Sequence, residues 1–264
     1  MALTFGVIGV GNMGGAILKG ALDAGVLRTD DVIVYDILPE ARAKAADWGV
    51  RVADDDDEVA AQADVVLLAV KPQNAQEALA QAGSALAGKA LLSIVAGVGS
   101  DRLRGWIDGD VRVLRLLPNT PALVFEGAFA LSSDNDFTQS ERDFATELFK
   151  ALGVVEFVPE HLLDAVCGLS GGAPAYVAMF IEAMADGGVQ QGLPRAVAYR
   201  LAAQTCLGTA KLILERGLHP GEAKDMVTSP AGTTIEGVAA LERGGFRGAV
   251  IDAIIAGAEK SKRL

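Results

Sequence analysis

The chain has 264 residues, of which 51% are hydrophobic, and its formal net charge is −11. That length is enough for two domains of about 100–200 residues each. The acidic balance argues against nucleic acids and anionic membranes as partners, because neutralising phosphate needs basic patches and the sequence has none. Cys167 and Cys206 lie inside apolar helical patterns, so we expect buried free thiols in a reducing compartment rather than a disulfide.

Nothing in the sequence predicts an export signal or a membrane anchor. The apolar N-terminus lacks a positive n-region and is rich in glycine. No run approaches the roughly 20 apolar residues of a membrane span. We therefore expect a cytoplasmic protein, and we expect no metal site.

A glycine-rich turn organises the first half of the chain. Residues 6–10 predict a buried strand, and Gly9, Gly11 and Gly14 have the G-x-G-x-x-G spacing that lets backbone amides approach a pyrophosphate. The helix that begins near Asn12 directs its positive end at those phosphates. A second strand, residues 31–35, ends in Asp36, where a carboxylate would accept hydrogen bonds from the adenosine ribose. A glycine turn without a ligand is the alternative, which this context disfavours.

The next elements continue the alternation of helix and strand. We expect a helix at 39–48, a strand at 50–53, and an acidic run at 54–58 that caps a helix at 57–63. Residues 64–70 form an uninterrupted apolar run, typical of a parallel strand covered on both faces. Its carboxyl end should open onto a ligand crevice. Lys71 follows this strand. It could be a catalytic acid, but we favour a charge at the rim of the crevice.

The alternation extends to residue 158, with helices expected at 75–86, 100–106 and 139–152 and strands at 90–95, 112–117, 127–132 and 154–158. Pro118 and Pro121 flank Asn119 and Thr120 and make a rigid loop at a strand end, which is either a simple turn or the floor of a pocket. This order predicts an α/β fold with a doubly wound parallel sheet. Residues 1–159 are therefore expected to be a Rossmann-type dinucleotide-binding domain.

The composition changes at about Glu160, and residues 160–264 predict an all-helical domain. Helical patterns occupy 162–169, 174–187, 194–215, 223–227, 235–242 and 246–260. The helices at 194–215 and 246–260 have apolar faces too broad to be covered within this domain. Obligate interfaces are the hydrophobic kind, so we expect burial against a second copy.

A hydroxyl-rich turn, residues 227–235, opens one of these helices. Its small residues leave backbone amides exposed at a helix N-terminus, which suits a carboxylate, and Ser229, Thr233 and Thr234 add donors. A helix-capping motif is the alternative. The two roles are compatible, because a ligand can satisfy the amides.

These motifs resemble those of the pyrroline-5-carboxylate reductase family, the last enzyme of proline synthesis, along nearly the whole chain. The matching blocks are GVGNMG at 9–14, AVKPQ at 69–73, SIVAGV at 93–98, LPNTPAL at 117–123, LSGGAPAYV at 169–177, EAMADGGVQQGLPR at 182–195, HPGEAKDMV at 219–227 and SPAGTTIEGVAALE at 229–242. Two departures are Gly172-Ala173, where the family usually reads SGSGPAY, and Ala231, which replaces the first glycine of SPGGT. Both exchange one small residue for another, so we expect an intact site.

The resemblance implies a Rossmann domain followed by a helical dimerisation and substrate domain. The reaction is hydride transfer from a reduced nicotinamide to the C=N carbon of 1-pyrroline-5-carboxylate, giving L-proline. The expected assembly is a homodimer, alone or within a decameric ring of dimers. The implied cofactor contacts are Gly9, Val10, Gly11, Asn12, Met13, Gly14, Asp36, Ala69, Val70, Lys71, Pro72, Ile94, Val95 and Ala96. The implied substrate contacts are Ser229, Gly232, Thr233, Thr234, Asn119, Thr120 and Glu160, with Thr234 in the catalytic role.

Asp36 predicts a tilt towards NADH over NADPH. Its carboxylate would bond both ribose hydroxyls and repel a 2′-phosphate, and no arginine directly follows it. NADPH is the alternative, since many members of the family place a small polar residue here and use NADPH.

Two other functions compete with this interpretation. A β-hydroxyacid dehydrogenase needs a base, usually a helical lysine, and here Lys211 and Lys224 are the only central candidates, neither in such a motif. A non-catalytic nucleotide-sensing dimer is the second alternative. The intact SPAGTTI turn argues against it.

Overall fold

The computed structural model describes residues 3–263. Contacts divide them into two compact units: unit 1 contains the residues up to Gly172 together with those from Ile255 onward, and unit 2 is Ala173–Ile254. Residues 160–172 thus group with unit 1 by their contacts. The boundary after residue 159 was expected from composition, which marks the end of the alternating pattern, and it stays a prediction.

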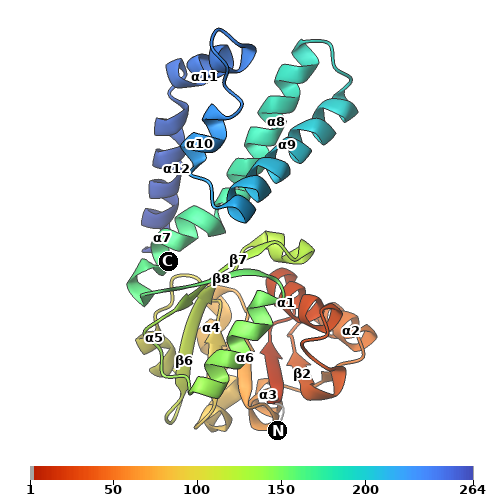
Figure 1. Cartoon of the computed structure of the whole chain (residues 1–264). Helices are drawn as coiled ribbons and strands as arrows, with labels where there is room; N and C mark the ends of the chain where they lie inside the picture. Colours follow the sequence, from red (N-terminus) through yellow and green to blue (C-terminus); the bar gives the residue numbers. More distant parts are fainter. Residues whose placement is uncertain (1–2, 264) are drawn as a thin grey trace. The chain divides into compact units, whose positions relative to one another are not determined.

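Unit 1 is built on an eight-stranded sheet with the order β3-β2-β1-β4-β5-β6-β7-β8 (Figure 1). The strands are β1 (Phe5–Ile8), β2 (Val32–Tyr35), β3 (Arg51–Val52), β4 (Val65–Leu68), β5 (Ala90–Ser93), β6 (Arg112–Leu117), β7 (Gly127–Ser132) and β8 (Gly153–Val158). The strands from β3 to β6 pair in parallel, as do β7 and β8. The predicted Rossmann-type sheet is therefore confirmed, with one exception.

That exception is β7, which runs antiparallel to β6. Only residues 118–126 connect the two strands, and they contain a 3₁₀ helix, η4 (Thr120–Val124). A parallel return needs a crossover of about a dozen residues or more, usually with a helix. The short connection therefore brings the chain back beside β6 in the opposite direction.

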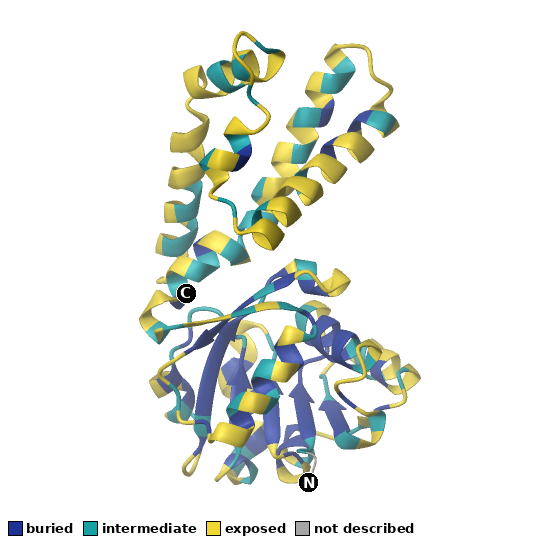
Figure 2. Ribbon diagram, in the orientation of Figure 1, coloured by how far each residue is buried: buried dark blue, intermediate teal, exposed yellow. Residues whose placement is uncertain are grey.

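Helices cover both faces of this sheet. They are α1 (Asn12–Asp23), α2 (Pro39–Asp47), α3 (Asp56–Gln62), α4 (Ala75–Ala82), α5 (Ser100–Arg104) and α6 (Gln139–Lys150), with the 3₁₀ helices η1 (Thr29–Asp31), η2 (Pro72–Asn74), η3 (Gly83–Leu86) and η5 (Glu160–Leu162). In β1, Val7 packs in one cluster with Ile17 of α1, and Ile8 packs in the other with Val59 of α3. Because consecutive strand residues point to opposite faces, each central strand must be apolar throughout. Figure 2 shows these strands as fully buried.

The acidic run caps α3, as predicted from the sequence. Asp55 is the N-cap residue, and its Oδ1 accepts a hydrogen bond from the Glu58 amide at 2.8 Å. The helix begins at Asp56, one position earlier than expected. This side-chain oxygen satisfies an amide that the first helical turn leaves without a backbone partner.

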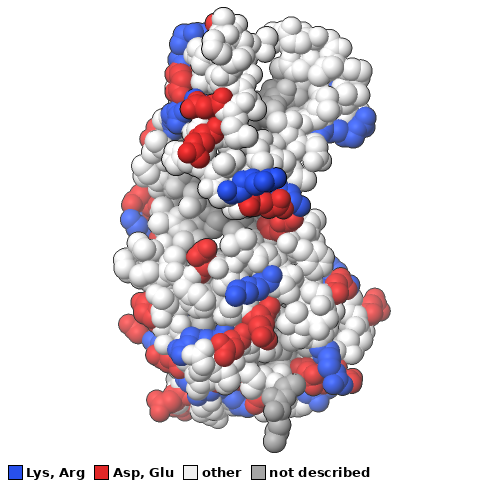
Figure 3. Space-filling view, viewed as in Figure 1, with Lys and Arg blue, Asp and Glu red and all other residues white. Residues whose placement is uncertain are grey.

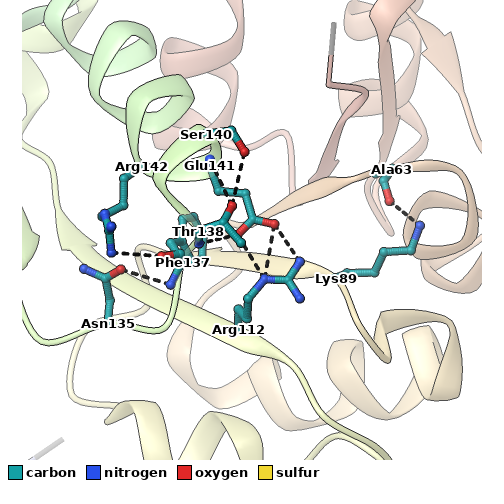
Figure 4. A network of polar contacts seen from close by, with 9 residues as sticks. All are labelled: Ala63, Lys89, Arg112, Asn135, Phe137, Thr138, Ser140, Glu141 and Arg142. Atoms are coloured by element: carbon teal, nitrogen blue, oxygen red, sulfur yellow. Dashed lines mark hydrogen bonds and ion pairs between the residues drawn. The ribbon is translucent and has the colours of Figure 1, made fainter. Parts of the chain in front are cut away.

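A bidentate ion pair fastens α6 to β6 (Figure 4). Thr138 and Glu141 form a capping box at the start of α6, in which the Thr138 amide donates to Glu141 Oε2 at 2.8 Å. The same carboxylate accepts from Arg112 Nε at 2.9 Å and from Arg112 Nη2 at 2.6 Å. Burial by itself would raise the pKa of Glu141, but the bonds from Arg112 and Thr138 hold it below its ordinary value.

The second half of the chain is helical, as predicted. Its elements are α7 (Leu163–Val166), the π-helix η6 (Cys167–Gly171), α8 (Ala173–Gln190), α9 (Arg195–Arg216), α10 (Pro220–Asp225), α11 (Thr233–Arg243) and α12 (Phe246–Ser261). The helix expected at 223–227 is α10, which starts earlier, at Pro220, and ends at Asp225; proline suits the first position of a helix, where no amide hydrogen is needed. Cys167 and Cys206 are free and partly buried.

Unit 2 leaves much apolar surface uncovered. Its small core contains Ala185, Ala198 and Ala202 between α8 and α9. Its large exposed apolar side chains include Val177, Met179, Phe180, Leu201, Leu207, Leu212, Leu214, Leu241, Val250 and Ile251. On the face drawn in Figure 3, wide areas over these helices carry no charged residue. A monomer rarely exposes so much contiguous apolar surface.

The expectation that no segment approaches a membrane span was wrong. The continuous helical stretch Glu160–Gln190 has a mean hydropathy of 1.3 and is long and apolar enough, by those two criteria alone, to cross a bilayer. Only 11% of its apolar window is buried within the protein. The sequence reading missed it because glycine, alanine and a few charged residues interrupt its larger apolar side chains.

We expect Glu141→Gln to reduce the free energy of unfolding at pH 7 by about 1–3 kcal/mol, because it removes the charged acceptor of Arg112. Since folding lowers the pKa of Glu141, its stabilisation is full above the unfolded pKa of about 4.3 and is lost as the pH falls from there through the lowered value. Urea unfolding at pH 7 and in acid measures both effects.

The matched control is Glu147→Gln, an exposed carboxylate on the same helix, which should change stability by less than about 0.5 kcal/mol. Equal losses in the two variants, or a loss at Glu141 that does not shrink in acid, would contradict this account.

Candidate functional site

The glycine turn joins β1 to α1 and lies against the end of β4. Gly9 has a φ of +95°, which L side chains rarely adopt, and its amide donates to the Tyr35 carbonyl at 2.8 Å. A Cβ at Gly9 would meet the Ala69 backbone at 2.9 Å. This position therefore requires glycine both for its backbone conformation and for its close approach to the neighbouring strand end.

The other two glycines have opposite surroundings. A Cβ at Gly14 would stand 2.1 Å from the Gly9 carbonyl oxygen, so Gly14 allows the helix to pack against the turn. A Cβ at Gly11 would have no protein atom within 4 Å. Gly11 is exposed and is the N-cap of α1, with no side-chain cap. An open space beside uncapped helix amides fits a pyrophosphate, so these residues suit a dinucleotide.

Asp36 lies at the end of β2, directly beside the glycine turn. Its Oδ2 accepts from the Val10 amide at 2.7 Å, and its Oδ1 accepts from the Leu38 amide at 2.9 Å. The structure thus brings together the motif and the acid that the sequence analysis paired. Each carboxylate oxygen keeps capacity for a second hydrogen bond, which leaves Asp36 able to accept ribose hydroxyls.

A second carboxyl group near this corner was read from the sequence only as part of the capping run. Asp56, at the start of α3, is 5% exposed. The pKa of Asp56 is raised to about 7, mainly by burial and to a smaller extent by the nearby charges of Asp55 and Asp36. Near neutral pH a substantial fraction of the Asp56 carboxyl groups is therefore protonated beside the charge of Asp36, and only the folded chain reveals it.

The ends of β4 and β5 open at the same edge as the glycine turn, because β1, β4 and β5 are parallel neighbours. The expected cofactor contacts Ala69–Pro72 and Ile94–Ala96 follow these two strands directly. Lys71 is exposed, and within residues 3–263 the structure gives it no ion pair, which suits a charge at the rim. This edge is where ligands bind in open α/β sheets.

Asn119 holds the proline-flanked loop in place. The residue is 8% exposed, its Oδ1 accepts from the Ala128 amide at 2.8 Å, and its Nδ2 donates to the Ser170 carbonyl at 3.1 Å. Thr120 follows, exposed, as the first residue of η4. The side chain of Asn119 is therefore engaged with backbone groups on both sides, whereas Thr120 is accessible.

Glu160 is also engaged within unit 1. Its Oε1 accepts from the Ser100 amide at 2.8 Å and from Arg115 Nη1 at 3.0 Å. Burial would raise the pKa of Glu160, but these bonds from Ser100 and Arg115 lower it overall. The group borders a polar cavity of about 350 Å³. Arg115, which sequence reasoning did not single out, thereby links β6 to the start of η5.

In unit 2, the turn before α11 presents its helix N-terminus without a side-chain cap. The N-cap is Gly232, and a Cβ there would lie 2.3 Å from Ser229 Oγ, so a larger residue would require the Ser229 side chain to move. Thr233 and Thr234 occupy the first helical turn and are exposed. The helix expected from residue 235 thus begins earlier, at Thr233, because Gly232 rather than a threonine takes the cap position.

Ala231, one of the two departures from the family pattern, has a φ of +57°. This left-handed conformation favours glycine, and a non-glycine residue there costs of the order of 1 kcal/mol. The family's glycine would relieve that strain. The backbone of the turn is nevertheless formed, and an intact site stays a prediction.

Family models match two parts of the chain. Residues 160–264 match the model described as pyrroline-5-carboxylate reductase dimerisation, and residues 4–97 match one described as NADP oxidoreductase, coenzyme F420-dependent. The pyrroline-5-carboxylate reductase of Methanosarcina acetivorans is 42% identical over 98% of this chain and 97% of its own length. The enzyme of that name from Escherichia coli K12 is 43% identical over 100% of this chain and 99% of its own length.

Solved structures agree with these relatives. A pyrroline-5-carboxylate reductase from Coxiella burnetii matches with a TM-score of 0.93 at 29% identity, covering 100% of this chain and 98% of that chain. The Plasmodium falciparum pyrroline carboxylate reductase with NADP bound matches with a TM-score of 0.89 at 29% identity, covering 99% and 97%. Likeness in sequence and in fold therefore extends over the whole chain.

Two glycine substitutions separate cofactor contact from packing. We expect Gly11→Ala to fold normally but to bind NAD(P)H at least about tenfold more weakly, because its methyl group would enter the open space where we expect the phosphates. Gly14→Ala should instead lose about 1–3 kcal/mol of stability or more, because its methyl group meets the Gly9 carbonyl. Calorimetric titration and thermal melting measure the two effects. Normal cofactor binding by a folded Gly11→Ala variant would refute the placement of the pyrophosphate.

Proposed function

The chain belongs to the pyrroline-5-carboxylate reductase family, and we propose that it reduces 1-pyrroline-5-carboxylate to L-proline with a reduced nicotinamide cofactor. The likeness to those oxidoreductases over the full length carries the proposal. The two competing functions receive no support. Lys211 pairs with Glu215, and Lys224 pairs with Asp225, so neither lysine is arranged as the base of an alcohol dehydrogenase.

Unit 1 would hold the cofactor. The bound nicotinamide supplies the hydride. The glycine turn and the first amides of α1 would bind the pyrophosphate, and Asp36 would bind the ribose. The ends of β4 and β5, Ala69–Pro72 and Ile94–Ala96, would border the rest of the dinucleotide, including the nicotinamide.

The turn before α11 in unit 2 would hold the substrate. Backbone amides of Gly232, Thr233 and Thr234 at a helix N-terminus favour a carboxylate, and Ser229 adds a hydroxyl. The Thr234 hydroxyl would hydrogen-bond the ring nitrogen. In support, Gly232 is the N-cap, and among the described residues the structure gives the Thr234 hydroxyl no bond that would occupy it.

The reaction needs little acid or base chemistry from the protein. An iminium nitrogen is already electrophilic and can enter protonated from solution, so orientation and carboxylate anchoring are the main requirements. The histidines are not needed for this. His219 Nδ1 accepts from the Gly221 amide at 3.0 Å and so caps α10.

The remaining expected substrate residues divide by what they contact. Thr120 is accessible for direct contact. Asn119 would act by holding its loop, and Glu160, bonded to Ser100 and Arg115, would act by positioning the segment after β5. We assign these two as positioning residues rather than catalytic ones.

The exposed apolar helices of unit 2 belong to a region matched by a dimerisation model, so we propose that they pair with a second copy. Burial in a dimer would also account for the apolar stretch Glu160–Gln190 without a bilayer. A ring of dimers stays a prediction. We further propose a cytoplasmic enzyme, in keeping with a reduced cofactor and free thiols.

We predict that Thr234→Ala folds and binds NADH normally but loses about 10- to 100-fold in kcat/KM for pyrroline-5-carboxylate, since a hydrogen bond to a charged group contributes about 1.5–3 kcal/mol. Steady-state assays with thermal melting measure both properties. Thr228→Ala is the control. Among the described residues the Thr228 hydroxyl bonds only the Lys224 carbonyl, so stability should change and kcat/KM should not. A Thr234→Ala enzyme with a lower Tm but unchanged kcat/KM would leave Thr234 without a catalytic role.

We predict that the wild-type enzyme has a higher kcat/KM with NADH than with NADPH, because the Asp36 carboxylate repels a 2′-phosphate. Asp36→Ser should shift that ratio towards NADPH by about tenfold or more. Initial rates with each cofactor measure it. A wild type that favours NADPH, with a ratio unchanged in Asp36→Ser, would show that this side chain does not set the preference.

A further inference from the structure

Arg42 of α2 lies beside Asp36, although it is six positions away in sequence. Its Nη1 donates to the Asp36 carbonyl at 2.6 Å and to the Ile37 carbonyl at 3.2 Å. Its guanidinium carbon is 5.4 Å from the centre of the Tyr35 ring. These contacts hold the guanidinium next to the end of β2, where the adenosine ribose is proposed to bind.

Most of the donors of this guanidinium remain available. An arginine side chain has five N–H donors, and the two bonds described use only Nη1. Within residues 3–263 neither Nε nor Nη2 has an acceptor, and no carboxylate lies within ion-pair distance. The Asp36 carboxylate is bonded instead to the amides of Val10 and Leu38. An unneutralised, anchored cation therefore stands beside the acid.

We propose that Arg42 is a phosphate-binding residue at the adenosine corner and that it opposes the discrimination that Asp36 exerts against a 2′-phosphate. This rests on the proposed binding of the ribose at Asp36. A guanidinium presents a planar fork that binds phosphate through two hydrogen bonds. Because the backbone carbonyls and Tyr35 already fix it, little side-chain freedom is lost on binding. Arg42 thus sets how far the enzyme tolerates NADPH.

The test compares the binding of adenosine 2′,5′-bisphosphate and 5′-AMP to the full-length protein by calorimetry. Arg42→Gln should weaken the bisphosphate about tenfold while changing AMP by less than about twofold. Lys44→Gln is the matched control, because it removes a cation from the same helix that instead lies 5.5 Å from the Trp48 ring. Its ratio of affinities should stay that of the wild type.

A double variant tests whether the two side chains act in opposite directions on the ratio of affinities. Asp36→Ser should raise the affinity ratio of bisphosphate to AMP by about tenfold, because the repelling carboxylate is gone. In Asp36→Ser/Arg42→Gln the ratio should fall back most of the way to the wild-type value, since the Arg42 cation is gone too. A gain that survives in the double variant overturns the proposal.

An unchanged ratio in Arg42→Gln, or an equal drop in Lys44→Gln, also overturns it. Should Arg42→Gln fail to fold, Arg42→Lys decides the matter: it keeps the charge but loses the fork, and its ratio should fall at least about threefold. The binding of these nucleotides is measured without pyrroline-5-carboxylate. If the protein did not reduce that substrate, the conclusion about Arg42 would therefore still stand. A wild type that favours NADPH would refute only the tilt to NADH, whereas one that binds neither nucleotide refutes the ribose placement and this proposal together.

Discussion

The close passage of the chain from β1 into α1 is the constraint on which the dinucleotide half of the protein depends. At Gly9 and Gly14 there is no room for a side chain, because the turn presses against the end of β4 and against itself. That contact sets where α1 begins and leaves its first amides facing the open space at Gly11. The same turn presents the Val10 amide to Asp36, so the fold of the turn helps to fix the position of the Asp36 carboxylate.

The loops at this edge are held by side chains that bond to backbone groups. Asp36 bonds the amides on either side of it in space, Asn119 bridges two segments, and Glu160 joins the start of α5 to Arg115. Buried or partly buried backbone groups in irregular segments need such partners, since no strand or helix satisfies them. Polar residues in these loops therefore serve structure first. Whether such a side chain can also bind a ligand depends on how many hydrogen bonds it can still form.

Unit 2 follows a different physical rule. Its helices bury few residues of their own and present apolar side chains outward, whereas the sheet of unit 1 is buried on both faces (Figure 2). Folding must offset the entropy of ordering the chain by removing apolar surface from water. A helical unit that does not achieve this alone is stabilised by covering the surface with another chain, which agrees with its match to a dimerisation model. The turn at Gly232, which opens α11 without a side-chain cap, belongs to this same helical unit.

The sequence by itself determined the features that are local along the chain. The alternation of strands and helices, the glycine turn, the acid at Asp36 and the hydroxyl-rich turn before α11 were all predicted, because each depends on side-chain periodicity or on turn chemistry within a few tens of residues. Only the tertiary structure decided the antiparallel direction of β7, the left-handed conformation of Ala231, and the bonds of Arg42 and Arg115. The bonds of the two arginines depend on where a side chain points once distant strand ends are brought to one edge, and one-dimensional patterns do not encode that direction. The direction of β7 and the conformation of Ala231 depend on the backbone path of a short connection and of a turn, which periodicity does not specify.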